Sequence, residues 1–179
     1  SLRQGYHGVH FGGMSVNGNT NFRRPYEPLL PGCFHVDTPW LYHNPYTDDP
    51  IRLGEICAEL LEREIVFQGP DTVAAFIAEP VQGAGGVIVP PSDYFPRIRE
   101  ICDQYDVLFI ADDVITGFGR TGTWFGLQHY GVEPDLLVSG KSLGGGLPLA
   151  AVTGRSEVVD SVGPGGLGGT FGGNPLACA

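Results

Sequence analysis

The sequence predicts an α/β protein built on a mostly parallel sheet with helices on both faces. Short runs of apolar residues lack polar alternation, which is typical of strands covered on both sides. A segment with helical periodicity separates the first two runs, and glycine clusters follow the runs, where open α/β sheets bind ligands. With 179 residues, 42% of them hydrophobic, the chain is long enough to bury one sizeable core.

Four strands are expected, in chain order. Each is a buried run of the length common for strands, and a turn signal or a glycine follows it. The first run ends at Glu79-Pro80 and a glycine turn, where Glu79 is expected to act as a supporting hydrogen bonder. The four runs are "VAAFIA" (73–78), "VLFIADD" (107–113), "DLLVSG" (135–140) and "LAAVTG" (149–154).

Three helices are expected around these strands. Residues 92–105 carry apolar side chains at helical spacing after a Ser92 or Asp93 cap, and residues 51–67 have an amphipathic pattern. The stretch "RSEVVDSV" (155–162) predicts a short capped helix. Residues 9–50, rich in Gly, Asn, Pro and aromatics, are interpreted as a long surface excursion of the same domain.

Charge and cysteine usage narrow the function classes. A formal net charge of -10 has the wrong sign for binding nucleic acid or anionic lipid, and no stretch approaches the roughly 20 apolar residues that span a bilayer. The four cysteines form no C-x-x-C pair, which favours a reduced, cytoplasmic location. The run "YHNPYTDD" (42–49) is interpreted as a solvated loop, and no metal site is expected.

Lys141 is the only lysine of the chain, and it lies between an apolar run and three glycines. The stretch "GKS" (140–142) resembles the end of a phosphate-binding loop, but the first glycine of that motif is replaced by Asp135, whose carboxylate would repel phosphates. The glycines and proline that follow cannot begin a helix. A nucleotide hydrolase is therefore disfavoured.

The favoured hypothesis makes Lys141 an amine nucleophile that forms a Schiff base. Desolvation at an apolar strand end would lower the pKa of its ammonium group and free the amine to attack a carbonyl. Asp112, at the end of "VLFIAD", would supply the anion that a protonated pyridine nitrogen needs. Together these residues predict a pyridoxal cofactor.

Four segments in order carry a resemblance to a family: "AAFIAEPVQGAGGVIVPP", "LFIADDVITGFGRTGTWFG", "LLVSGKSLGGGLPLAAV" and "GTFGGNPLACA". Together with "GYHG" they resemble class III aminotransferases, fold-type I enzymes that use pyridoxal 5'-phosphate. The resemblance implies that Lys141 and Asp112 are catalytic, that Val114 and Tyr6 pack on the two faces of the cofactor with His7 beside Tyr6, and that Thr170 reaches the phosphate of a neighbouring subunit. It thus implies a homodimer with shared sites.

By the same resemblance, residues 1–179 are the central part of the large cofactor-binding domain, truncated at both ends. The family's upstream phosphate loop and downstream small domain are absent from the sequence, which begins without Met and stops in a helical pattern. Asp113 and Ile115 depart from the family pattern, since they stand where many members have the longer Glu and Gln.

The implied reaction transfers an amino group from a primary amine or ω-amino acid to a keto acid. Relatives that use 2-oxoglutarate often have "QGEGG" where this chain has "QGAGG", and Ala84 offers no charge to a substrate-binding arginine. A small acceptor, pyruvate or glyoxylate, is therefore expected. The alternatives are a 4-aminobutyrate- or ornithine-type aminotransferase that uses 2-oxoglutarate, a glutamate-semialdehyde-type aminomutase, and a non-catalytic protein of the same fold.

Overall fold

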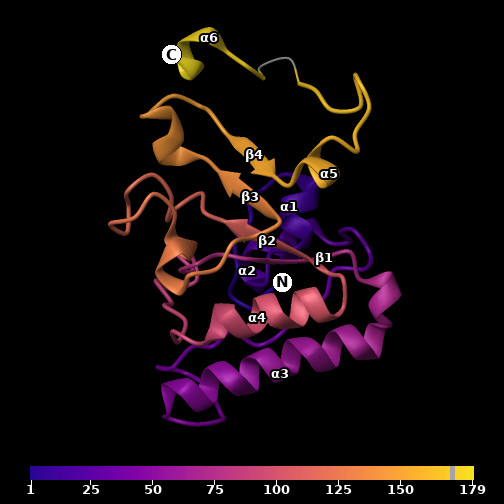
Figure 1. The fold of residues 1–179 in the computed structure, drawn as a ribbon, viewed down its shortest axis with the longest axis vertical. Coiled ribbons are helices and arrows are strands. Elements are labelled where there is room, and N and C mark those ends of the chain that lie inside the picture. The colour runs from indigo at the N-terminus through magenta and orange to yellow at the C-terminus, as the bar shows by residue number, and fades with distance from the viewer. Residues whose placement is uncertain (170–171) are drawn as a thin grey trace.

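The computed structural model describes residues 1–169 and 172–179, and its centre is a four-stranded sheet (Figure 1). The strands follow chain order across the sheet: β1 (Ala75–Ala78), β2 (Leu108–Asp112), β3 (Leu136–Ser139) and β4 (Ala151–Gly154). The first three are parallel, and β4 runs antiparallel to β3. All four predicted strands and the mostly parallel sheet are confirmed.

Two long helices cover one face of the sheet. Helix α3 (Pro50–Gln68) begins where the Asp49 side chain accepts hydrogen bonds from the N–H groups of Ile51 and Arg52, and it ends at Gly69. Helix α4 (Tyr94–Gln104) has Asp93 at its N-cap position, as expected, but that carboxylate binds Arg97 instead of capping the backbone. In Figure 1, α4 lies between the sheet and α3.

The core lies between the sheet and these helices. Alternate side chains of β1 and β2 point to this face and are buried, because successive residues of a strand point to opposite sides. The rings of Phe76 and Phe95 both stack on Phe109, with centroids 6.2 and 5.8 Å away. These aromatic contacts fix α4 on the first two strands.

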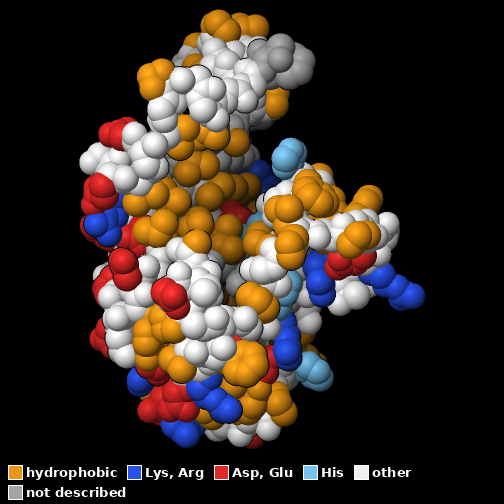
Figure 2. Space-filling model, turned by 90° about the vertical axis from the view of Figure 1, so that its right-hand side faces the viewer, with side chains coloured by type: hydrophobic (Ala, Val, Ile, Leu, Met, Phe, Trp, Pro, Cys, Tyr) orange, Lys and Arg blue, Asp and Glu red, His pale blue; other side chains and the backbone are white. Residues whose placement is uncertain are grey.

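The opposite face of the sheet is less covered than predicted. Ile77, Ile110 and Val138 are only half-buried there, and Val152 of β4 is 59% exposed. The view in Figure 2 shows hydrophobic side chains gathered across the middle of the molecule. The N-terminal segment reaches this face near the carboxyl ends of the strands, through the contact of His7 with Asp112.

The N-terminal segment is more than a surface excursion, which corrects the sequence interpretation. Leu2 and Val36 pair through a parallel bridge and belong to the core, at 1% and 7% exposure. Between them lie the short helices α1 (Phe11–Ser15) and α2 (Thr20–Arg23). Their apolar anchors are too widely spaced for periodicity to reveal them.

Near the C-terminus the described chain forms two more short helices, α5 (Ser156–Val159) and α6 (Pro175–Cys178). Helix α5 is the one predicted after β4, but no side chain caps its first turn. Throughout the described ranges, no helix is both long and apolar enough to cross a membrane.

Candidate active site

A cavity of about 300 Å³ lies at the carboxyl ends of β2 and β3. Five of the six predicted site residues line it: Tyr6, His7, Asp112, Val114 and Lys141. Gly8, Val9, Glu79, Ile115 and Val138 complete the wall. Residues from the N-terminal turn and from three strand ends therefore meet at one place. The sixth predicted residue, Thr170, lies outside the described residues.

One part of the cavity wall is a buried pair of His7 and Asp112. The His7 Nδ1 atom lies 2.8 Å from the Asp112 Oδ2 atom, and the two side chains are 2% and 8% exposed. An ionised carboxylate can only accept, so the Nδ1–H of His7 donates to it. The His7 Nε2 atom is also buried and has no hydrogen-bond partner within the described part of the chain.

The direction of each acid follows from the pleat of β2. Asp112 points to the same face as Ile110, into the cavity, and its Oδ1 atom accepts the Val114 N–H at 3.2 Å. Asp113 points to the opposite face and is fully buried. It accepts the Thr116 hydroxyl at 2.6 Å and the Gly126 N–H at 2.7 Å. Asp113 therefore holds the following loop and does not line the cavity.

Lys141 directly follows the extended Gly140 at the end of β3, but it is not buried as the sequence hypothesis required. Its side chain is exposed, and among the described residues it forms no ion pair with Asp112. Its backbone is left-handed, with φ 44°, which is unusual for a residue other than glycine. A β-carbon at Gly140 would lie 3.3 Å from Val114, so this glycine lets the lysine-bearing turn pack closely against the cavity wall.

Tyr6 and His7 are held by a turn that only its glycines permit. Gly8 has φ 110°, a conformation that disfavours side chains. The Tyr6 N–H donates to Glu79 at 2.8 Å, and the Tyr6 ring packs edge-on against Phe22 of α2, with centroids 4.9 Å apart. Glu79 also accepts the Gly83 N–H at 3.0 Å, which confirms its expected role as a hydrogen bonder.

Sequence reasoning did not identify two features of the site. The contact of His7 with Asp112 joins residues 105 positions apart, so no local pattern signals it. The second feature is the raised pKa of Glu79, which burial causes despite the two backbone hydrogen bonds to its carboxylate. The position of this acid at the end of an apolar strand was the sequence signal that could have predicted the shift. Ala84 is exposed on a turn and does not line the cavity.

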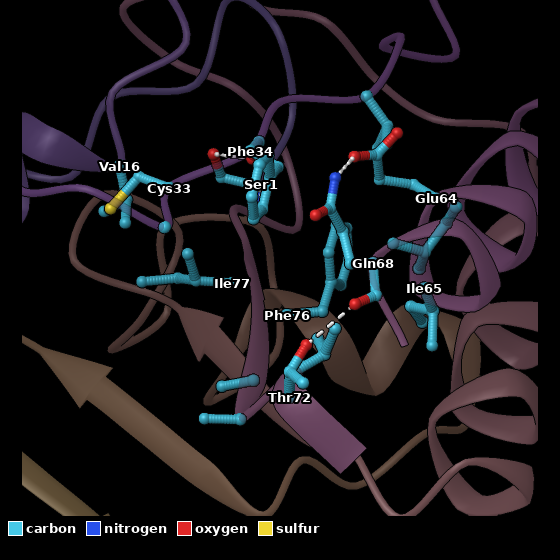
Figure 3. A pocket seen from close by; sticks show the side chains of 16 residues that line it. Ser1, Val16, Cys33, Phe34, Glu64, Ile65, Gln68, Thr72, Phe76 and Ile77 are labelled. Carbon is cyan, nitrogen blue, oxygen red and sulfur yellow. Dashed lines mark hydrogen bonds between the residues drawn. The ribbon is translucent and has the colours of Figure 1, made fainter. Parts of the chain in front are cut away.

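A second cavity, of about 280 Å³, lies along the outer edge of β1 (Figure 3). Apolar side chains such as Phe76 and Ile77 line much of it, and the Gln68 amide donates to Glu64 at its rim at 2.7 Å. None of the predicted site residues is near it. In the described ranges, no three His, Cys, Asp or Glu side chains gather in a way that could hold a metal ion.

The first cavity defines a class of site that fits a carbonyl-bearing aromatic cofactor. A buried carboxylate, oriented through both of its oxygens, suits a protonated ring nitrogen, and a flexible amine at the rim suits a carbonyl. Residues 1–179 match the family model for class III aminotransferases, and the chain belongs to that family. Aminotransferases of this class depend on pyridoxal phosphate.

Individual relatives agree with this assignment. Putrescine–pyruvate aminotransferase of Pseudomonas aeruginosa is 47% identical over 179 residues, which cover 98% of this chain and 39% of the relative. Acetylornithine aminotransferase of Methanopyrus kandleri is 42% identical, over 98% of this chain and 40% of the relative. An amine transaminase from an uncultivated Pseudomonas species, solved with pyridoxal phosphate bound, matches with a TM-score of 0.94 and 49% identity, over 99% of this chain and 42% of that one. The chain thus spans about two fifths of the length of these relatives.

Proposed function

We propose that the full-length protein transfers an amino group from a primary amine or ω-amino acid to pyruvate or glyoxylate, with pyridoxal phosphate as cofactor. The supporting observation is that the only lysine of the chain shares one cavity with a buried carboxylate and imidazole. In this proposal residues 1–179 are the central part of the cofactor-binding domain.

The residues around the cavity have separate tasks. Bound pyridoxal phosphate supplies a protonated ring that withdraws electrons from the amine-bearing carbon. Asp112 stabilises the positive charge at the ring nitrogen, while His7 Nδ1–H and the Val114 N–H keep its two oxygens in place. Lys141 Nζ would act as the base that takes the proton from the amine-bearing carbon and holds it for return to the bound molecule. Tyr6 and Val114 line the cavity and would hold the two faces of the ring.

The acceptor is argued from one position. Ala84 carries no charge and is exposed on the turn of residues 83–86, so it cannot pair with an arginine that binds a second substrate carboxylate. The relative named putrescine–pyruvate aminotransferase supports the same choice, whereas the relative named acetylornithine aminotransferase corresponds to the ornithine-type alternative. The shared dimeric site that includes Thr170 and the cytoplasmic location belong to this proposal as well.

Chemical mapping of the lysine tests the function. The full-length protein is loaded with pyridoxal phosphate, reduced with borohydride and digested, and the cofactor mass is expected on the peptide that contains Lys141. Lys141→Ala is expected to abolish turnover and to leave some noncovalent cofactor binding, since only the nucleophile and proton carrier are removed. Label on another peptide would contradict the proposal.

Steady-state assays with each keto acid test the acceptor. With one amine donor held in excess, kcat/KM is expected to be higher for pyruvate or glyoxylate than for 2-oxoglutarate. The reverse order would reject the inference from Ala84 and favour the 2-oxoglutarate alternative, without affecting the assignment of Lys141.

A further inference from the structure

Asn17 is fully buried just after α1, in the segment that the sequence did not connect with the site. Its Oδ1 atom accepts the N–H of His7, and its Nδ2 atom donates to the carbonyl oxygen of Gly8 at 2.9 Å. The two halves of one amide therefore bind the peptide groups on either side of the turn that carries His7. An amide suits this place because it combines one acceptor and one donor group.

The same turn is held from its other side by Glu79. The carboxylate of Glu79 accepts the Tyr6 N–H, so the consecutive N–H groups of Tyr6 and His7 each bind a buried side chain. The backbone of Asn17 is fixed as well, because its main-chain carbonyl oxygen lies 2.9 Å from the Nε2 atom of His35. A β-carbon at Gly13 would overlap the His7 carbonyl oxygen, so the backbone of α1 also packs directly on the turn.

These contacts reach the reacting region through one side chain. His7 donates to Asp112 from Nδ1, and the position of its ring depends on the backbone that Asn17 binds. We propose that Asn17 is a positioning residue that keeps the His7 imidazole against Asp112. The proposal rests on the proposed function, since Asp112 must face the cofactor ring for this position to matter.

The experiment uses the full-length protein and the variant Asn17→Leu, which keeps the side-chain shape and removes both hydrogen bonds. The ring nitrogen signals of His7 are recorded by NMR in the cofactor-free protein and assigned by their loss in His7→Phe. They are expected to shift in Asn17→Leu, because the Nδ1 contact with Asp112 loosens. In the loaded enzyme kcat is expected to fall about tenfold or more, as misplaced catalytic groups are costly.

Asn19→Leu is the matched control. Asn19 lies two positions further along the same loop, caps α2 and binds Gln4, but it does not bind the peptide groups of His7 and Gly8. It is expected to leave the His7 signals and kcat unchanged. A loss of kcat in Asn19→Leu equal to that in Asn17→Leu would indicate general loosening of the loop and reject the proposal.

A double-mutant cycle separates positioning from stability. If Asn17 acts through His7, then Asn17→Leu causes no further loss of kcat in the His7→Phe background. Losses that multiply, or unchanged His7 signals in Asn17→Leu, would overturn the proposal. If Asn17→Leu does not fold, Asn17→Asp enters the same cycle, because it retains an oxygen that accepts the His7 N–H. In the borohydride experiment, cofactor mass on another lysine would reject the proposed function. The NMR test of Asn17 could still be interpreted, because it uses the cofactor-free protein.

Discussion

Buried acidic side chains at the two ends of the sheet have different hydrogen-bond partners. At the amino end of β3, Asp135 accepts the Phe109 N–H at 2.7 Å, Arg99 at 2.8 Å and Arg155 at 2.9 Å. At the carboxyl ends, Asp112, Asp113 and Glu79 are buried, and within residues 1–169 and 172–179 none of them binds an arginine. Backbone N–H groups, a hydroxyl and an imidazole are their partners.

The pKa values follow this difference. Burial raises the pKa of Asp135, but the hydrogen bonds from Phe109, Arg99 and Arg155 outweigh burial and leave the pKa below its usual value. Burial raises the pKa of Glu79 and of Asp113, and their hydrogen bonds do not compensate fully. The acid at the amino end is therefore stabilised in its charged form, whereas two acids at the carboxyl end have raised pKa values, which are common at functional sites.

The largest expected effect is on activity, at the carboxyl end. Asp112→Asn keeps the size of the side chain and removes its charge, so the full-length enzyme should retain its fold and lose about two orders of magnitude or more in transamination rate. That loss corresponds to one preorganised electrostatic group, about 3 kcal/mol. Single-turnover kinetics and circular dichroism measure the two properties. A milder loss would mean that another group stabilises the ring nitrogen.

The next effect is on stability, at the amino end. Asp135→Asn leaves two guanidinium groups without their carboxylate and should lower the free energy of unfolding by about 2 kcal/mol. Urea titration of the full-length protein measures this change. The rate per folded molecule should match that of the parent, because Asp135 lies at the end of the sheet away from the cavity. A loss of rate without a loss of stability would contradict the assignment of Asp135 to stability alone.

The two ends of the sheet should also differ in how the free energy of unfolding depends on pH. The lowered pKa of Asp135 means that its stabilisation is present above its unfolded pKa, near 4, and is lost as the pH falls through the lower folded value. The raised pKa of Glu79 works in reverse: stability falls as the pH rises from its unfolded value, near 4.3, through the folded one. Asp135→Asn should therefore weaken the dependence of the free energy of unfolding on pH below about 4. Glu79→Gln should weaken it above about pH 4.3. If the two variants differed from the parent protein in the same pH range, these assignments would be contradicted.

The smallest expected effect separates the two arginines of Asp135. The side chain of Arg99 is 19% exposed and that of Arg155 is 55% exposed, so water screens the Arg155 contact more strongly. Arg99→Ala should lower the urea midpoint clearly more than Arg155→Ala does. Equal shifts would show that exposure does not govern the strength of the pair.

The parts of the molecule that the sequence predicted are those with local signals. Apolar runs located the four strands, and the carboxyl ends of parallel strands meet at one edge, which brings Asp112 and Lys141 to the same cavity. The class III resemblance found Tyr6 and His7 but not the hydrogen bond from His7 to Asp112, because that contact depends on how a distant turn is held.

Other features depend on packing that no short pattern records. The antiparallel direction of β4 and the exposure of Lys141 both depend on the path of residues 140–150, which carry no periodic pattern. Leu2 and Val36 join the core from a segment without periodicity. Asn17 looks like an ordinary loop asparagine until its two backbone partners are seen.

The left-handed backbone of Lys141 lowers the stability of the fold at a residue whose side chain the proposed reaction requires. A side chain in this conformation costs about 1 kcal/mol relative to glycine, which adopts it freely. A redesign that optimised thermal stability alone would replace Lys141 with glycine, gain a few degrees of melting temperature and lose the only lysine of the chain, which lines the cavity. Stabilisation programmes for this protein should therefore hold position 141 fixed and look for their gains at the opposite end of the sheet.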